Sequence, residues 1–181
     1  GSPIVFSAGT GGVSGLVNSS GYLGLYRNGA GGYGSFLSTN QLTAGKWYHL
    51  AWVTSDGSQW YGYVDGVQGT FAAGWSGEGT TSPGYVGTYG NGVGTQSPNG
   101  FISNVRVIKG TALYTTDFTP PTAPLTATEN TKLLCCKSNS SATAFDVSPG
   151  TITSVNAVAT NFNPFTDDID TVRGKQSGYA T

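Results

Sequence analysis

The sequence predicts an all-β protein, an antiparallel two-sheet β-sandwich of the jelly-roll type. Short apolar and aromatic segments recur between turn signals at a spacing of about 8–12 residues, the pattern of sandwiches and barrels. Glycine accounts for 29 of the 181 residues, which supplies the tight turns of such a fold. No segment keeps the 3.6-residue apolar period of a helix beyond one or two turns. With 12% aromatic and 9% charged residues, the composition excludes a disordered tail and an exposed helical rod.

Eight segments concentrate β-branched and aromatic residues between turn signals and are predicted to be strands. They are Ile4–Ala8, Tyr22–Tyr26, Trp47–Thr54, Trp60–Val67, Gly84–Gly87, Phe101–Lys109, Lys132–Lys137 and Ile152–Ala159. The turn Ser55–Ser58 predicts a hairpin, and Asp65-Gly66 predicts a second tight turn because glycine accepts a positive φ. Polar, glycine-rich loops are expected at Gly9–Gly15, Asn28–Gly34, Gly74–Pro83 and Gly87–Gly100.

The last third of the chain changes character twice. The proline-rich segment Phe118–Leu125 is expected to run extended over the sandwich, because proline lacks the donor that a central strand needs. Tyr114, Phe118 and Leu125 are the residues expected to hold it there. Residues 161–181 gather a high share of the charge and are predicted to be a connector to a further domain, which leaves residues 1–160 as the sandwich.

Charge and cysteine content limit the classes of partner. The net charge is −1 and the eight basic residues are scattered, so the sequence predicts no nucleic-acid binding. No run of about 18 apolar residues exists, so no membrane insertion is predicted. Cys135 and Cys136 are adjacent, and neighbouring side chains on a strand point to opposite faces, so no ordinary disulfide is expected. A disulfide between them would require a distorted peptide. One histidine and two adjacent cysteines do not supply a structural zinc site.

Several blocks of sequence carry a resemblance to a known family. In chain order they are Lys46–Val53 (KWYHLAWV), Tyr63–Val67 (YVDGV), Tyr85–Gly87, Asn99–Val107, Lys109–Pro121 and Leu133–Cys135. Over about residues 40–160 their order and spacing resemble the laminin-G-like domains of the concanavalin A-like lectin and glucanase jelly rolls, particularly those of phage and marine bacterial surface proteins. Such domains usually begin with one or two strands ahead of the equivalent of Ile4, so the resemblance implies an excised segment.

The resemblance includes glucanases, so catalytic residues have to be considered. A retaining glycosidase needs two carboxylates close together, but the only glutamates, Glu78 and Glu129, are isolated and Asp65 lies in a turn. His49 is the only histidine and has no nucleophile or orienting acid in its sequence context, so it is expected to pack locally. No enzymatic activity is predicted.

Two further patterns are weak. The segment Gly29–Gly34 matches G-x-G-x-x-G, but no helix is predicted after it, so a plain loop is expected. Asp167, Asp168 and Asp170 are oxygen ligands at close spacing that calcium could use, yet they lack the glycine and distal glutamate of an EF-hand loop. A solvated connector is the favoured interpretation, and no cofactor is predicted.

Sugar binding is the positive hypothesis. A lectin site needs an exposed aromatic ring for stacking and amide groups for hydroxyl recognition; the candidates are Trp75, Tyr85, Tyr89, Asn91, Gln96 and Asn99. Tyr85 could instead belong to the core and Trp75 could anchor its loop. The predicted function is a non-catalytic carbohydrate-recognition or adhesion module on a virion or cell surface, with a host-surface glycan as partner. The alternative is a structural virion module that binds other virion or surface proteins and no sugar. Homo-oligomerisation through the parent protein is compatible with both.

Overall fold

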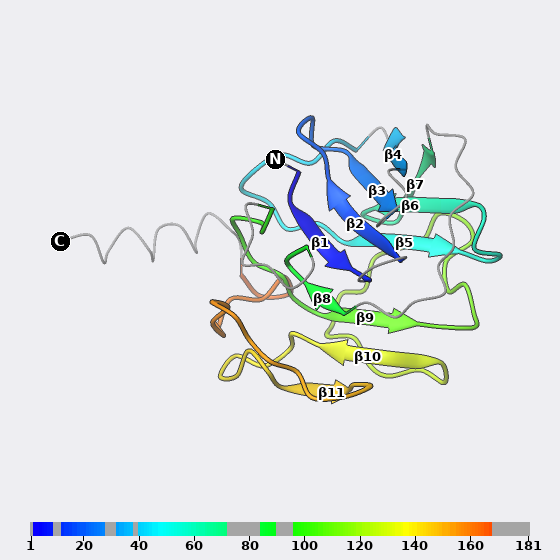
Figure 1. The fold of residues 1–181 in the computed structure, drawn as a ribbon. Coiled ribbons are helices and arrows are strands. Elements are labelled where there is room, and N and C mark those ends of the chain that lie inside the picture. The colour runs from blue at the N-terminus through cyan, green and yellow to red at the C-terminus, as the bar shows by residue number, and fades with distance from the viewer. Residues whose placement is uncertain are drawn as a thin grey trace. The chain divides into compact units, whose positions relative to one another are not determined.

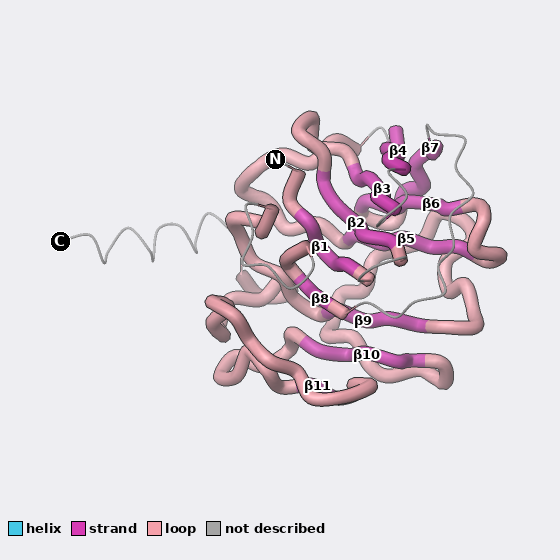
Figure 2. The backbone as a smooth tube through the Cα atoms, viewed as in Figure 1, coloured by secondary structure: helices cyan, strands magenta, loops and turns pink. Residues whose placement is uncertain are grey.

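The computed structural model describes residues 2–8, 12–27, 32–37, 40–71, 84–89 and 96–167, and in these ranges it contains strands and loops but no helix (Figure 2). The chain forms two compact units, which are described separately below. The first unit comprises Gly1–Leu42, His49–Ile102 and Thr111–Pro120. The second comprises Thr43–Tyr48, Ser103–Gly110 and Pro121–Thr181. In the described residues no helix is long and apolar enough to cross a bilayer.

Eight strands of the first unit form one continuous antiparallel sheet in the order β5-β6-β7-β4-β3-β2-β1-β8 (Figure 1). Their bounds are β1 Ile4–Ser7, β2 Val13–Val17, β3 Leu23–Arg27, β4 Gly32–Leu37, β5 Leu50–Thr54, β6 Trp60–Val64, β7 Val67–Phe71 and β8 Tyr85–Val86. Every pairing between neighbouring strands is antiparallel. The antiparallel all-β architecture is therefore as predicted.

The sheet folds back on itself. The rings of Phe6 on β1 and Trp52 on β5 meet edge to face with centroids 5.2 Å apart, although six strand positions separate β1 from β5 in the sheet order. A flat sheet would place these strands about 29 Å apart, at roughly 4.8 Å per strand. Trp52 Nε1 also donates a hydrogen bond of 3.1 Å to the carbonyl of Gly24 on β3. The β5–β6 part of the sheet therefore packs face to face on the β1–β2–β3 part.

The core of the first unit lies between these two parts. Residues directly opposite in an antiparallel pair share a face, so the register puts Val13, Leu23 and Leu25 on the face of Phe6, which contacts Trp52. Trp60 and Val64 share the face of Trp52 on the facing strands. Phe6 and Trp52 are partly buried; the other five side chains are buried, and Leu25 is fully so. Burial of each such side chain contributes about 1.5–3 kcal/mol relative to an exposed one.

The hairpin between β5 and β6 is closed by a turn that the sequence predicted. The carboxylate of Asp56 accepts hydrogen bonds from the backbone N–H of Gln59 at 2.9 Å and of Ser58 at 2.8 Å, and from Ser58 Oγ at 2.7 Å. The backbone bond from Gln59 first, and then the bonds from Ser58, lower the pKa of Asp56 to about 2. These bonds favour the ionised carboxylate in the folded state.

The Asp56 turn predicts a specific acid dependence. Because the folded-state pKa lies below the unfolded value of about 3.9, the stabilisation is complete above about pH 4 and is lost as the pH falls through about 2. Between about pH 5 and 2, the urea midpoint of the Asp56→Asn variant is expected to fall less than that of the parent chain. Parallel curves for the two proteins would contradict the assignment. The effect is small because the carboxylate is solvent-exposed.

The hairpin between β6 and β7 has a two-residue turn at the predicted position. Asp65 and Gly66 both have positive φ, 50° and 78°, as a type I′ turn requires. Asp65 Oδ1 accepts a hydrogen bond of 2.8 Å from His49 N, and Asp65 N donates one of 2.8 Å to His49 O. The turn is thereby tied to the residue that precedes β5, which explains the aspartate at this position.

Residues 111–120, called the strap below, cover the outer face of β5–β6. The rings of Tyr114 and Phe118 are stacked with centroids 3.6 Å apart, and Phe118 lies 5.4 Å from the rings of both His49 and Tyr63. Phe118 N donates to the carbonyl of Gly66 at 3.0 Å. Of the three residues predicted to hold the segment Phe118–Leu125 on the sandwich, Tyr114 and Phe118 lie on the sheet as part of the strap, whereas Leu125 belongs to the second unit.

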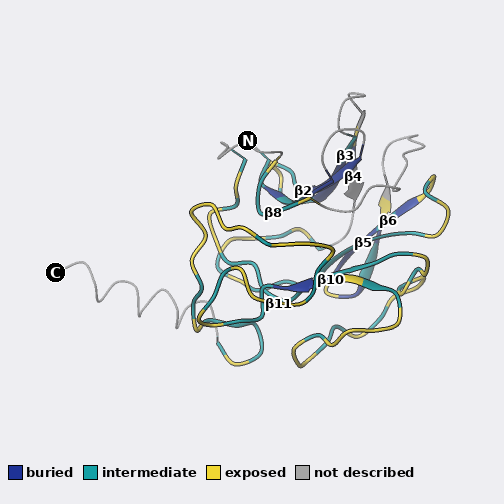
Figure 3. Ribbon diagram, turned by 60° about the horizontal axis from the view of Figure 1, so that its bottom comes forward, coloured by how far each residue is buried: buried dark blue, intermediate teal, exposed yellow. Residues whose placement is uncertain are grey.

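The second unit contains a three-stranded antiparallel sheet in the order β11-β10-β9, with β9 Val105–Ile108, β10 Thr131–Cys135 and β11 Phe145–Val147 (Figure 1). Leu133, Leu134 and Cys135 on the central strand are buried (Figure 3). Leu125 belongs to this unit, where its N–H donates to Asn104 Oδ1 at 2.9 Å.

The observed strands differ from the predicted ones in several places. The strand predicted at Trp60–Val67 ends at Val64, and β7, which follows the turn, was not predicted. The strands β2 and β4 occupy part of the predicted loops Gly9–Gly15 and Asn28–Gly34. Each has a partner strand on both sides, and this pairing compensates for the low strand propensity of its glycines. β11 was not predicted, and the predicted strand Ile152–Ala159 is irregular. In that segment Asn156 has a φ of 59°, which breaks an extended chain, and Val158 is 85% exposed. The predicted loop Gly74–Pro83 lies outside the described residues.

Candidate functional site

The register of the first sheet aligns tyrosine and serine side chains in one row across five strands. Ser7 is opposite both Tyr85 on β8 and Ser14 on β2, Ser14 is opposite Tyr26 on β3, and Tyr26 is opposite Tyr33 on β4. Opposed residues share a face, so all five side chains lie on the side of the sheet away from the Phe6 and Leu25 core. Ser14 Oγ donates to Ser7 Oγ at 2.9 Å, and both serines are fully buried.

The accessible part of this row is at the β3–β4 end. Tyr33 is 48% exposed and Tyr89, which follows β8, is 38% exposed. The ring of Tyr89 meets the ring of Tyr26 edge to face with centroids 6.1 Å apart. Tyr26, Tyr33 and Tyr89 are called the tyrosine cluster below. Exposed aromatic rings gathered at one place on a domain surface are typical of a binding site.

Gly24 lies directly beneath the ring of Tyr33 on the same face of the sheet. A Cβ at this position would lie 2.8 Å from Leu16 Cδ1, 3.1 Å from the carbonyl oxygen of Gly34 and 3.3 Å from Tyr33 Cε2. A larger residue would therefore push the Tyr33 ring outward and crowd β4. The glycine between Leu23 and Leu25 thus permits the close approach of the ring to the sheet.

The predicted sugar-binding residues are only partly brought together. Tyr89 is in the tyrosine cluster, whereas Tyr85 is at the other end of the row, beyond the buried serines. The backbone carbonyl of Gln96 accepts a hydrogen bond of 2.8 Å from Ile4 N at the start of β1. Asn99 is exposed. Trp75 and Asn91 lie outside the described residues.

Tyr26 and Tyr33 were not identified from the sequence. Tyr26 precedes the segment Asn28–Gly34 that was predicted to be a loop and Tyr33 lies within it, and only the pairing of β3 with β4 places the two opposite each other. Tyr26 alternates with Leu25 along β3, and this period of two could have indicated a side chain on the non-core face. Tyr33 lay within the spurious G-x-G-x-x-G match, whose last three residues belong to β4 and not to a phosphate-binding turn.

Several ionisable residues of the described chain take part in local structure. Asp117 Oδ1 accepts from Gln68 N at 2.8 Å, and Asp167 Oδ2 accepts from Asn163 N at 3.0 Å. His49 packs its ring edge to face against Phe118 and Tyr114, as the sequence predicted. Within the described ranges no three metal-ligating side chains of histidine, cysteine, aspartate or glutamate come together. Glu78, Asp168 and Asp170 lie outside those ranges.

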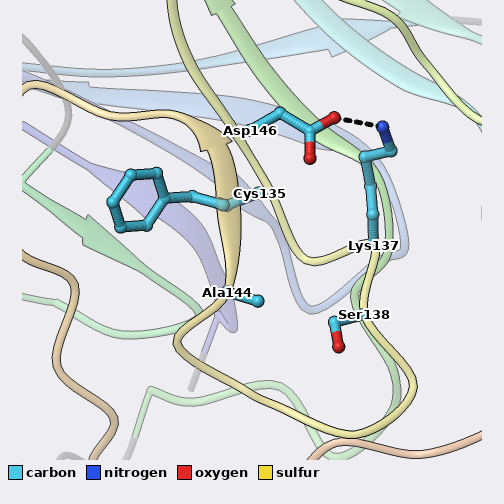
Figure 4. A pocket seen from close by; sticks show the side chains of 6 residues that line it. Cys135, Lys137, Ser138, Ala144 and Asp146 are labelled. Carbon is cyan, nitrogen blue, oxygen red and sulfur yellow. Dashed lines mark hydrogen bonds and ion pairs between the residues drawn. The ribbon is translucent and has the colours of Figure 1, made fainter.

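The second unit has a pocket of about 200 Å³, lined by Cys135, Lys137, Ser138, Ala144, Phe145 and Asp146. Asp146 accepts an ion-pair hydrogen bond from Lys137 Nζ across the pocket wall (Figure 4). None of the predicted sugar-binding residues lines this pocket. It is therefore a separate feature from the tyrosine cluster.

Comparison with protein families matches residues 1–116 to Laminin_G_3, described as the concanavalin A-like lectin/glucanases superfamily. No curated protein and no solved structure gave a match. The matched segment contains β1 to β9, the tyrosine cluster and the strap as far as Thr116. The antiparallel sheets agree with the jelly-roll sandwich that this superfamily implies. The chain belongs to the concanavalin A-like lectin/glucanases superfamily.

Proposed function

We propose that the chain is a non-catalytic, lectin-like module that binds a surface glycan through the tyrosine cluster. The single observation that carries this proposal is the gathering of Tyr26, Tyr33 and Tyr89 on one face, with Tyr33 and Tyr89 exposed. A tyrosine ring offers an apolar face to the C–H groups of a sugar and a hydroxyl to its polar groups. The superfamily includes lectins, which makes a glycan the natural ligand class.

The superfamily also includes glucanases, and the state of the described carboxylates favours the non-catalytic alternative. Asp56, Asp65 and Asp117 accept hydrogen bonds from backbone N–H groups in turns and between segments, and Asp146 is paired with Lys137. A glycosidase would need two carboxylates facing the same sugar, one of them acting as a general acid. Because these carboxylates already bind backbone N–H groups or Lys137, the proposal assigns the module to recognition and not to hydrolysis.

The proposal sets the module on a virion or cell surface. Its support is the resemblance of the blocks from Lys46 to Cys135 to domains of phage and marine bacterial surface proteins. The polar surface, with few charges, suits neutral sugars better than charged polymers.

The test is a glycan array with the intact chain, followed by titration calorimetry on the best ligand. Tyr33→Ala and Tyr89→Ala are each expected to weaken binding by at least about tenfold, or about 1.4 kcal/mol. Phe145→Ala is the matched control. Phe145 is an aromatic residue with nearly the same exposed fraction as Tyr33, 47% against 48%, but it belongs to the second unit. Equal losses for Tyr33→Ala and Phe145→Ala would contradict the assignment of the site.

The alternative is a structural module that binds other surface or virion proteins and no sugar. It is favoured by the exposure of Val155 and Val158, 66% and 85%, on the segment after β11. Failure of the intact chain to bind any glycan, together with protein binding that Val158→Asp abolishes, would replace the lectin proposal with this one.

A further inference from the structure

The two adjacent cysteines bring their sulfur atoms together, contrary to the alternation expected along a strand. Cys135 is the last residue of β10, and Cys136 follows it with a φ of 60°. Both are free cysteines, and their Sγ atoms lie 3.5 Å apart. In a continuing strand the two side chains would point to opposite faces. The left-handed conformation of Cys136 instead turns its sulfur toward that of Cys135.

Contacts from two neighbouring segments hold the pair in this arrangement. Cys135 is opposite Val105 of β9 and Phe145 of β11, so it is fixed from both sides. The carbonyl of Cys136 accepts a hydrogen bond of 3.0 Å from Asn104 N. A left-handed conformation costs about 1–2 kcal/mol for a residue other than glycine, so these contacts maintain a position that a free chain would seldom adopt.

The two sulfurs have different environments. Cys135 is only 4% exposed, whereas Cys136 is partly exposed. The hydrogen bond from the Cys135 thiol lowers the pKa of Cys136, while the same bond and burial raise the pKa of Cys135. The thiolate is the reactive form of cysteine, and an accessible thiolate beside a second thiol is typical of sites that hydroperoxides oxidise.

We propose that Cys135 and Cys136 form a redox-modification site, in which a hydroperoxide converts the vicinal dithiol to a disulfide with Cys136 as the attacking sulfur. The Cys136 thiolate attacks one peroxide oxygen, the O–O bond breaks, and the leaving oxygen takes a proton to give water or an alcohol. The Cys136 sulfenic acid is then attacked by Cys135. The S–O bond breaks and water leaves as the sulfur–sulfur bond forms. Two thiols are oxidised by two electrons, and one peroxide is reduced.

Oxidation changes the structure at the end of β10. The sulfurs must approach from 3.5 Å to about 2.05 Å, which requires the peptide between them to rotate. That rotation displaces the backbone of Cys136, whose carbonyl accepts the hydrogen bond from Asn104 N, and it moves Cys135, which lines the pocket of the second unit (Figure 4). The redox state therefore alters both the β9–β10 junction and the wall of the pocket.

The first experiment treats the intact chain with one equivalent of hydrogen peroxide and follows intact mass, free thiols and amide hydrogen exchange. The expected product is a monomer that has lost two hydrogen atoms and both free thiols, is restored by dithiothreitol, and exchanges the Asn104 amide faster. A disulfide-linked dimer, retained oxygen atoms as the main product, or two thiols that persist would each overturn the proposal.

The second experiment assigns the attacking sulfur with two variants whose folding is checked by thermal unfolding. Cys135→Ala keeps Cys136 and is expected to form a sulfenic acid that dimedone traps. Cys136→Ala keeps only the buried sulfur and is expected to react at least about tenfold more slowly. Equal rates would contradict the assigned roles. If either variant fails to fold, limiting iodoacetamide on the parent chain decides instead: alkylation mainly at Cys136 supports the assignment, and alkylation mainly at Cys135 contradicts it.

Discussion

Replacing Gly66 by alanine is expected to detach the strap from β5–β6 and to lower the free energy of unfolding by about 3–5 kcal/mol. A Cβ at this position would lie 1.8 Å from the carbonyl oxygen of Phe118 and 2.9 Å from its carbonyl carbon. Both atoms are backbone, so no side-chain rotation relieves the clash. Gly66 also has a φ of 78° and accepts the hydrogen bond from Phe118 N, so the hairpin and the strap would have to separate. Urea unfolding followed by tryptophan fluorescence measures the effect.

Gly110→Ala is the matched control for this prediction. Gly110 has a φ of 96°, and a Cβ there would meet no atom within 4 Å. Its substitution therefore carries only the conformational cost of a positive φ, about 1–2 kcal/mol. The difference between the two variants isolates the contact between Gly66 and Phe118. If both variants lose the same stability, the strap does not rest on the β6–β7 turn.

The features predicted correctly from the sequence are those whose signals lie within a few residues. The turn at Asp56 and the turn at Asp65-Gly66 are encoded by side chains that bond to their own neighbouring backbone and by a residue that accepts positive φ. Tyr114 and Phe118 were predicted to hold the proline-rich segment on the sandwich, because the prolines of that segment exclude a central strand. Such signals need no knowledge of distant segments.

The missed strands depend on pairing with other strands, which their own residues do not encode. β2 and β4 each contain glycines and have weak strand propensity, but β2 pairs with β1 and β3, and β4 pairs with β3 and β7. The opposition of Tyr26 and Tyr33 follows from one of these pairings, and so the tyrosine cluster could be predicted only at Tyr89. The approach of the Cys135 and Cys136 sulfurs has a similar origin, because the end of β10 is set by the segment at Asn104.

Replacing Tyr63 by alanine is expected to be the second severe substitution, with a loss of about 3–5 kcal/mol in the free energy of unfolding. Tyr63 is fully buried, and its ring lies 5.4 Å from the ring of Phe118 and 6.3 Å from that of Tyr114. Removal of the ring would leave a cavity beneath the strap. Tyr63→Phe is the matched control, because it keeps the ring and removes only the hydrogen bond of 3.3 Å from the hydroxyl to Tyr114 O. Its expected cost is about 1 kcal/mol.

Alkaline unfolding separates the role of the Tyr63 hydroxyl from that of the ring. Burial, followed by the charges of Tyr61 and Asp117, raises the pKa of Tyr63 above the ordinary value of 10.0. Above about pH 10 the unfolded chain releases this proton while the folded chain retains it, so stability falls as the pH rises through that window. The urea midpoint of the parent chain is expected to fall more steeply there than that of Tyr63→Phe. If Tyr63→Phe proves as unstable as Tyr63→Ala at neutral pH, the hydroxyl and not the ring holds the strap. If the two alkaline slopes coincide, Tyr63 ionises in the folded chain as readily as in the unfolded one, and the strap does not seal it from water.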